Sequence, residues 1–168
     1  MVPTHALRLQ AMLRSLTEVI IPALDPSQRL AIDQANIVAG NLRILLDQTG
    51  RTDEYLRVEL HEFRDLGSAL LELAPDTSDA HESRSTITEA DTVSEWALAE
   101  QLLRLKGTVD RLLKMTLASS DPSVAKAASV LVLDQARKQA TRERVWFRGA
   151  GFELDPTALP PLDAVLSR

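Results

Sequence analysis

Three arginines near the end of one predicted helix have the spacing of an anion-binding face. Arg144 follows Arg137 by seven residues and Arg148 follows Arg144 by four, so one side of a helix carries all three. A guanidinium group binds carboxylate or phosphate through two parallel hydrogen bonds, and the indole of Trp146 offers a stacking surface beside them. The cluster predicts a site for an anionic ligand, such as a nucleotide-bearing molecule, or for an acidic patch on a partner.

The same cluster also has a structural explanation. Cations near the C-terminus of a helix stabilise it by about 0.3–1 kcal/mol through the helix dipole. Trp146 and Phe147 would then only anchor the segment that follows the helix, and Lys138 and Arg142 beside the arginines fit either explanation. The sequence leaves both explanations open.

A second polar group lies on an otherwise apolar helix. Asp33 and Asn36 share one side of it, with Gln34 and Asn41 close by. If the helix is central, these side chains face a polar cavity, and a buried, unpaired Asp33 would be costly enough to indicate a binding site. In the alternative, Arg29 pairs with Asp33 and the polar side faces solvent.

Metal binding lacks the residue pattern that it needs in a helical bundle. Bundles that hold two irons use Glu-x-x-His pairs, and no glutamate stands three residues before His5, His61 or His81. His61 and Asp65 are four residues apart on a polar helix face, which favours a solvated pair over a metal site. We therefore expect no bound metal.

Nucleophilic and phosphate-binding motifs are missing as well. The chain has no cysteine, which excludes disulfides and thiolate chemistry. It has no G-x-S-x-G motif and no glycine-rich phosphate loop, and Gly149-Ala150-Gly151 is interpreted as a helix stop. These absences predict no cofactor and no catalytic residue, and they favour a non-enzymatic protein.

Charge and hydropathy limit the partners. The chain has 168 residues and a net charge of −5, which argues against general nucleic-acid binding. No run of about 18 apolar residues predicts a membrane span, and Arg8 and Arg14 interrupt what would be the apolar part of a signal peptide. We expect a cytoplasmic protein, with a protein partner or self-association and an anionic small molecule as the further possibility.

The element expected to organise the fold is a helix over Asp25–Gln48. Asp25 fits the capping position and Pro26 the first helical position. A narrow polar stripe lies opposite a broad apolar side, so the helix is predicted to bury about two-thirds of its circumference. The stripe comprises Arg29, Asp33, Asn36, Gly40, Arg43 and Asp47. This pattern predicts the central helix of a bundle.

The other segments follow from periodicity, caps and prolines. Further helices are expected over 4–24, 52–74, 86–118 and 121–148, with a mobile loop at 76–85 and a tail at 149–168. Thr86 and Glu89 have the spacing of a capping box. Val124–Leu133 is almost wholly apolar and is expected to be buried or to lie at an interface.

The sequence thus predicts an all-α protein with one domain over 1–168. Its architecture is an antiparallel bundle of about five helices, with four in the core, one extra helix and a C-terminal clip. The expected function is that of an interaction or structural protein, either a homo-oligomer or an accessory subunit. The alternative is a small-molecule-binding or enzymatic bundle that holds an anionic ligand between helices, with Arg137, Arg144, Arg148 and Trp146 at its mouth.

Overall fold

The computed structural model describes residues 4–88, 95–151 and 153–167, and all of their regular secondary structure is helical. The prediction of an all-α protein is therefore confirmed. Contacts group the chain into two compact units, one formed by Met1–Arg51 with Arg142–Val165 and the other by Thr52–Thr141 with Leu166–Arg168. The predicted single domain and its four-plus-one arrangement of helices stay predictions.

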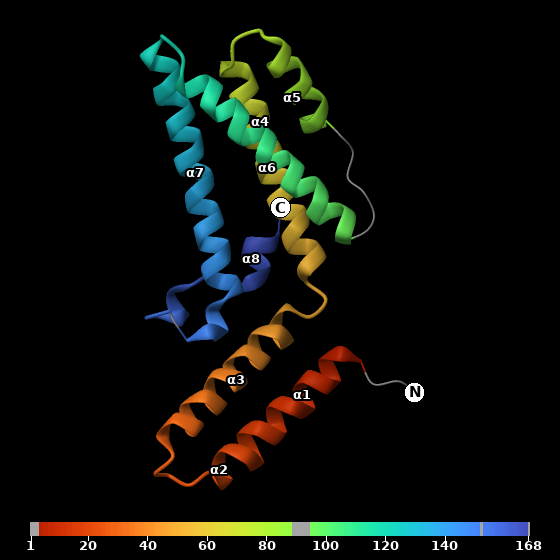
Figure 1. Cartoon of the computed structure of the whole chain (residues 1–168), viewed down its shortest axis with the longest axis vertical. Helices are drawn as coiled ribbons and strands as arrows, with labels where there is room; N and C mark the ends of the chain where they lie inside the picture. The colour runs from red at the N-terminus through yellow and green to blue at the C-terminus, as the bar shows by residue number, and fades with distance from the viewer. Residues whose placement is uncertain (1–3, 89–94, 152, 168) are drawn as a thin grey trace. The chain divides into compact units, whose positions relative to one another are not determined.

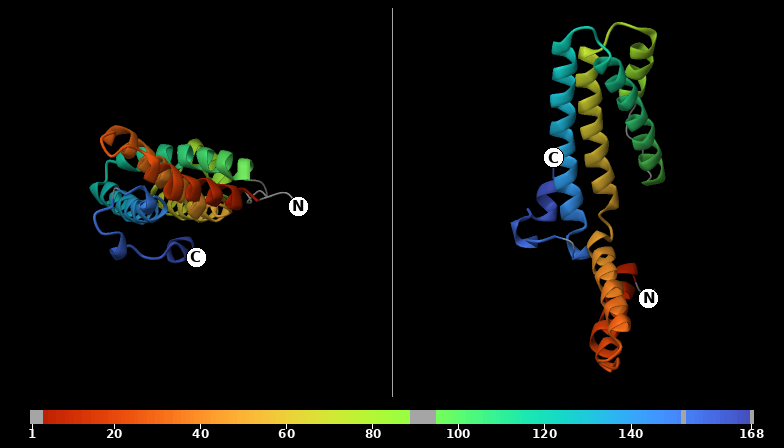
Figure 2. Two further views of the ribbon diagram at one scale, coloured as in Figure 1. Left: turned by 90° about the horizontal axis from the view of Figure 1, so that it is seen from below. Right: turned by 60° about the vertical axis from the view of Figure 1, so that its left-hand side comes forward.

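The second unit holds the main hydrophobic core. Its helices are α4 (Thr52–Leu73), α5 (Ser78–Thr88), α6 (Glu95–Leu117) and the part of α7 (Pro122–Trp146) that precedes residue 142. The contacts place α6 against α4. The right-hand view of Figure 2 shows α7 alongside α4. The buried cluster comprises Leu60, Leu66, Leu70, Ile87, Leu98, Leu102, Leu105, Val109, Leu112 and Ala128. Most of these residues belong to the apolar stripes predicted for the helices over 52–74 and 86–118.

A buried ion pair also joins α4 to α6. Lys106 Nζ lies 2.6 Å from Glu59 Oε1, and the Glu59 side chain is only 6% exposed. The same ammonium group lies 5.1 Å from the centre of the Phe63 ring. The cation thus compensates a buried carboxylate and also contacts an aromatic face.

Residues 76–85, predicted to form a mobile loop, are helical over most of their length, so that prediction is wrong. The first turn of α5 is capped by Thr77, whose Oγ1 accepts a hydrogen bond from the Ala80 amide at 3.3 Å. Ala80, Ser83 and Ile87 form the buried side of the helix. Small side chains are enough to bury one side of α5, because the helix packs closely on its neighbours. The prediction of a loop had assumed that a buried helix needs large apolar residues. Thr86 lies inside α5, and its proposed capping partner Glu89 is outside the described residues.

Gly67 of α4 is a point of close approach within this core. A Cβ atom at Gly67 would lie 3.0 Å from Ile87 Cδ1 and 3.3 Å from Val109 Cγ2. Gly107 of α6 is the opposite case, since a Cβ atom there would meet nothing within 4 Å. The two glycines therefore separate the effect of packing from that of helix propensity.

Replacing Gly67 with valine is expected to lower the free energy of unfolding by about 1–3 kcal/mol, because the added methyl groups overfill a closed site. Urea denaturation followed by circular dichroism measures the loss. The matched variant Gly107→Val should be neutral or stabilising by about 0.4 kcal/mol, as valine has the better helix propensity. Equal effects of the two substitutions would show that α5 does not pack on α4 at this point.

The first unit begins with a helical segment that contains one wide turn. α1 (His5–Ser15) continues through a π-helical turn, η1 (Leu16–Ile20), into α2 (Ile21–Ala23). Pro22 has no N–H, so it removes a ladder hydrogen bond, and the turn before it bonds instead from the Ile21 amide to the Leu16 carbonyl. Pro22 thus lies in the last short element of the helix predicted over 4–24.

α3 (Arg29–Gln48) pairs with this first segment, and Figure 1 shows α1 and α3 side by side. Only Ala39 and Ile44 of α3 are buried. The prediction that it buries about two-thirds of its circumference at the centre of a bundle is therefore wrong. The broad apolar side exists, but within this unit α3 packs on the segment α1–α2 and on the short turn η2 (Arg148–Ala150).

The C-terminal segment completes the first unit by packing on the second half of α3. A Cβ atom at Gly149 would lie 3.2 Å from Ile44 Cγ1, and Gln48 Nε2 donates a hydrogen bond of 3.1 Å to the Trp146 carbonyl. Arg51 and Asp163 form an ion pair of 2.7 Å. The elements that follow are η3 (Pro156–Ala158) and α8 (Leu162–Leu166), so the predicted tail contains the short last helix expected of it.

Candidate functional site

One side of α3 carries large apolar side chains that nothing in the first unit covers. Leu30, Ile37, Val38 and Leu45 are between 50% and 74% exposed. Gln34 and Asn41 lie between them at helical spacing and are exposed too. These six residues are called the outer face of α3, and the face contains no charged residue.

The helical segment before α3 is equally poor in buried side chains. None of the residues of α1, η1 or α2 is buried. Leu7, Met12 and Val19 are more than half exposed, and Ile20 is about half exposed. Two packed helices cover only one strip of each other, so a further layer would be needed to cover the large apolar side chains that stay exposed on this hairpin.

The predicted arginine cluster has one member that is already held by a carboxylate. Arg144 donates to both oxygens of Glu153, from Nε at 2.9 Å and from a terminal nitrogen at 2.6 Å. The Glu153 side chain is 17% exposed, and its hydrogen bond to Arg144 holds the pKa of that carboxyl below its ordinary value. The pair fastens the segment after α7 back onto the helix, an ion pair that neither explanation of the cluster predicted.

Glu153→Gln is expected to make the stability of the protein less dependent on pH in the acid range. Because the folded-state pKa of Glu153 is lowered, the stabilisation by its charge is complete above the unfolded value, near 4.3, and disappears as the pH falls through the folded value. Urea denaturation between about pH 3 and pH 6 should show the two proteins converging as the pH falls. A constant difference across this range would contradict the role given to the pair.

The other predicted site residues are divided between the two units. Arg137 is exposed and belongs to the second unit, whereas Trp146 and Arg148 are half-buried in the first, where the Trp146 carbonyl accepts the bond from Gln48. Asp33 and Asn36 are exposed on α3, as the solvent-facing alternative expects. Their binding of a ligand stays a prediction.

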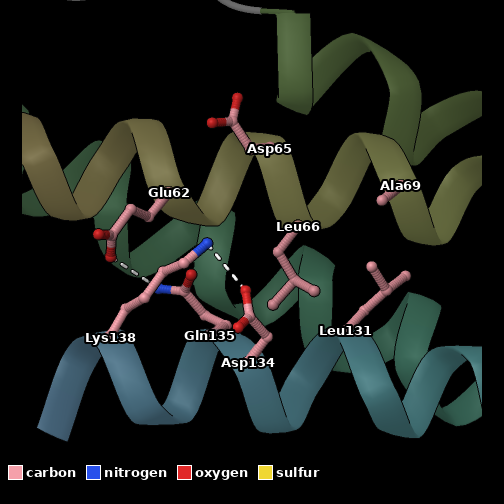
Figure 3. A pocket seen from close by; sticks show the side chains of 8 residues that line it. All are labelled: Glu62, Asp65, Leu66, Ala69, Leu131, Asp134, Gln135 and Lys138. Atoms are coloured by element: carbon pink, nitrogen blue, oxygen red, sulfur yellow. Dashed lines mark hydrogen bonds and ion pairs between the residues drawn. The ribbon is translucent and has the colours of Figure 1, made fainter. Parts of the chain in front are cut away.

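A polar pocket of about 150 Å³ lies between α4 and α7 (Figure 3). Gln135, only 7% exposed, donates to Glu62 at 2.9 Å, and Lys138 lies 2.9 Å from Asp134. The hydrogen bond to Asp134 and its negative charge, together with the charges of Glu62 and Asp65, raise the pKa of Lys138. The bond from Gln135 to Glu62 joins the two helices across the pocket, whereas Lys138 and Asp134 pair along α7.

The apolar stretch Val124–Leu133 of α7 is less buried than predicted. Within it only Ala128 is buried, and Val130 and Leu133 are more than half exposed. An open groove of about 540 Å³ runs beside it, lined by Ala69, Glu72, Leu73, Ser123, Lys126, Ala127, Val130 and Leu131. The part of the prediction that expected burial is wrong, and the part that expected an interface stays a prediction.

A third hollow, of about 400 Å³, lies between α5 and α6 and was not found from the sequence. Its lining comprises Thr86, Leu103, Arg104, Gly107, Thr108 and Arg111. Thr108 is buried, and its Oγ1 accepts a hydrogen bond of 3.0 Å from Arg111. The only sequence signal was two arginines seven residues apart on one helix, which is common on solvated helices.

Metal ligands do not gather anywhere in the described part of the chain, where no three His, Asp or Glu side chains could hold an ion together. Within the same residues, no helix is long and apolar enough to cross a membrane. Comparison with known proteins finds no family model, no curated protein and no solved structure that matches this chain. The outer face of α3 and the apolar side of α1 are therefore the leading candidates for a functional surface.

Proposed function

We propose that this protein is a non-enzymatic helical interaction protein that associates with a second copy of itself through the first unit. The observation that carries the proposal is the exposure of large apolar side chains on both helices of a two-helix hairpin. Leu30, at 74% exposure, is the most exposed of the apolar residues on α3. A second hairpin laid against the first would supply the missing layer and form a four-helix bundle.

A second copy is favoured over an unrelated partner by the chemistry of the surface. The outer face of α3 has no charge that would select an oppositely charged partner. Most soluble oligomers are homo-oligomers with a two-fold interface, in which one patch meets itself. Burying the exposed half of one large aliphatic side chain contributes about 1 kcal/mol, which changes the dissociation constant about fivefold.

Native mass spectrometry of the purified full chain tests the proposal. The expected result is a species of twice 18.5 kDa with nothing added, which separates into single chains on denaturation. A single chain at every concentration would contradict self-association. Extra mass that leaves on denaturation would instead indicate a retained ligand.

The second candidate function is the binding of an anionic small molecule between helices. The hollow between α5 and α6 supports it, because among the described residues its lining contains Arg104 and Arg111 and no carboxylate. Thr108 holds one nitrogen of Arg111 and leaves its other donors for an anion. This hollow now supports the idea better than Arg144, whose donors already meet Glu153. A phosphate- or carboxylate-bearing mass in the native spectrum would favour this candidate.

A further inference from the structure

On the outer face of α3, apolar and amide residues follow one another in the same order from either end of the helix. Ile37 follows Leu30 by seven residues, Val38 is the next residue, and Leu45 follows Val38 by seven. Gln34 and Asn41 stand three residues to either side of this central pair. The pattern is therefore symmetric about the midpoint between Ile37 and Val38, with apolar residues matching apolar ones and amide matching amide.

All six members of this face are exposed, whereas the residues that turn toward α1 are not. Ile32, Ala35, Ala39, Leu42 and Leu46 are buried or half-buried. Steps of four, three, one, three and four residues keep Leu30 to Leu45 on one side of a helix. The face thus lies beside the seam with α1 and stays open along about 22 Å of the helix axis.

Resting on the proposed self-association, we propose that two copies pair through antiparallel α3 helices centred between Ile37 and Val38. In this arrangement Leu30 lies level with Leu45 of the second copy, and Ile37 and Val38 of both chains meet at the two-fold axis. Gln34 lies level with Asn41 of the second copy, so that an amide carbonyl faces an amide N–H twice in the interface. Antiparallel pairing also opposes the two helix dipoles, which parallel pairing does not.

The proposed pairing of Gln34 with Asn41 of the second copy is compatible with the hydrogen bond that Asn41 makes within its own chain. Asn41 Nδ2 donates to the Ile37 carbonyl at 3.0 Å. This bond fixes the Asn41 amide on the outer face, with its oxygen and its second N–H left to bond across the interface. Polar residues at one level of an apolar seam specify register and direction in paired helices.

Single cysteines test the direction of pairing, because the natural chain contains none. Under mild oxidation of the full chain, Ile37→Cys should form a covalent dimer. Leu30→Cys alone should not, since its two copies would be fifteen residues apart along the axis, about 22 Å. Leu30→Cys mixed with Leu45→Cys should again form a covalent dimer that contains one chain of each.

The matched control is Asn36→Cys, which lies on the exposed polar side of the same helix. Ile37→Cys should cross-link about tenfold faster than this control, because pairing raises the local thiol concentration. If the apolar-to-cysteine changes weaken the dimer, Gln34→Cys mixed with Asn41→Cys gives the same test with polar positions.

Two results would overturn the antiparallel pairing while self-association stands. One is a wild-type dimer in which Leu30→Cys cross-links to itself as fast as Ile37→Cys, which means a parallel pair. The other is a wild-type dimer in which neither Ile37→Cys nor the mixture of Gln34→Cys with Asn41→Cys exceeds the Asn36→Cys control, which means another face. A wild-type protein that remains a single chain without oxidation would instead refute the proposed function itself.

Discussion

Replacing Ile37 with lysine is expected to convert the self-associated protein into single chains. Ile37 is 55% exposed in the single chain, so the folded chain accommodates a lysine there. In the pair, the ammonium group would have to leave water at the centre of an apolar interface, which raises the dissociation constant by about 100-fold or more. Sedimentation velocity of the variant beside the wild type measures the change.

The neighbouring substitution Asn36→Lys adds the same charge on the opposite side of α3 and should leave the dissociation constant within about threefold of the wild type. Both variants should keep the helical circular-dichroism spectrum of the wild type. Equal weakening by the two lysines would mean that net charge, and not the outer face of α3, governs association.

Replacing Leu60 with alanine is expected to cause the largest loss of stability, about 2–5 kcal/mol, because it leaves a cavity in the closed core of the second unit. Leu60 is fully buried in that cluster. A loss of this size is a large part of the total stability of a chain of this length. Chemical denaturation by urea measures it.

The matched change is Leu30→Ala, which removes the same atoms from a leucine that is 74% exposed. In dilute solution, where chains are single, it should change the free energy of unfolding by no more than about 0.5 kcal/mol. Its cost should appear only at concentrations at which the chains associate. Equal losses in dilute solution would mean that the first unit has a closed core of its own.

The sequence was a good guide where packing and local rules agree. The helix predicted over 52–74 is α4 at Thr52–Leu73, and Leu60, Leu66 and Leu70 on its apolar side lie in the buried core. Gly50 shortly follows the end of α3, and its φ of +80° is the left-handed conformation that glycine adopts at low cost. Periodicity and caps decide such elements without knowledge of their neighbours.

One repeated tripeptide shows where local rules stop. Asp121-Pro122-Ser123 begins α7 at Pro122, with the Ser123 amide bonded to Asp121 at 2.8 Å. Asp25-Pro26-Ser27 makes the same 2.8 Å bond, yet α3 begins only at Arg29, after one separate turn. The cap forms in both places, and the residues beyond it determine whether the helix continues.

The candidate site could be predicted only in part. The sequence predicted that the broad apolar side of Asp25–Gln48 would be buried at the centre of a bundle. It predicted that the apolar stretch Val124–Leu133 of α7 would be buried or lie at an interface. The spacing of apolar residues predicts how much of a helix surface is apolar. It does not predict which other element or chain covers that surface. The cluster around Arg144 illustrates the same limit, because Glu153 lies nine residues away and enters through a turn that periodicity does not describe.

Sedimentation equilibrium of the wild-type chain between about 1 μM and 100 μM is the most direct test of self-association, since this range brackets the affinities of moderate interfaces. We expect an average mass that rises with concentration from 18.5 kDa toward twice that value. A mass of one chain over the whole range would contradict it. The exposed faces of α1 and α3 would then need another partner, and the hollow beside Arg104 and Arg111 would become the leading site.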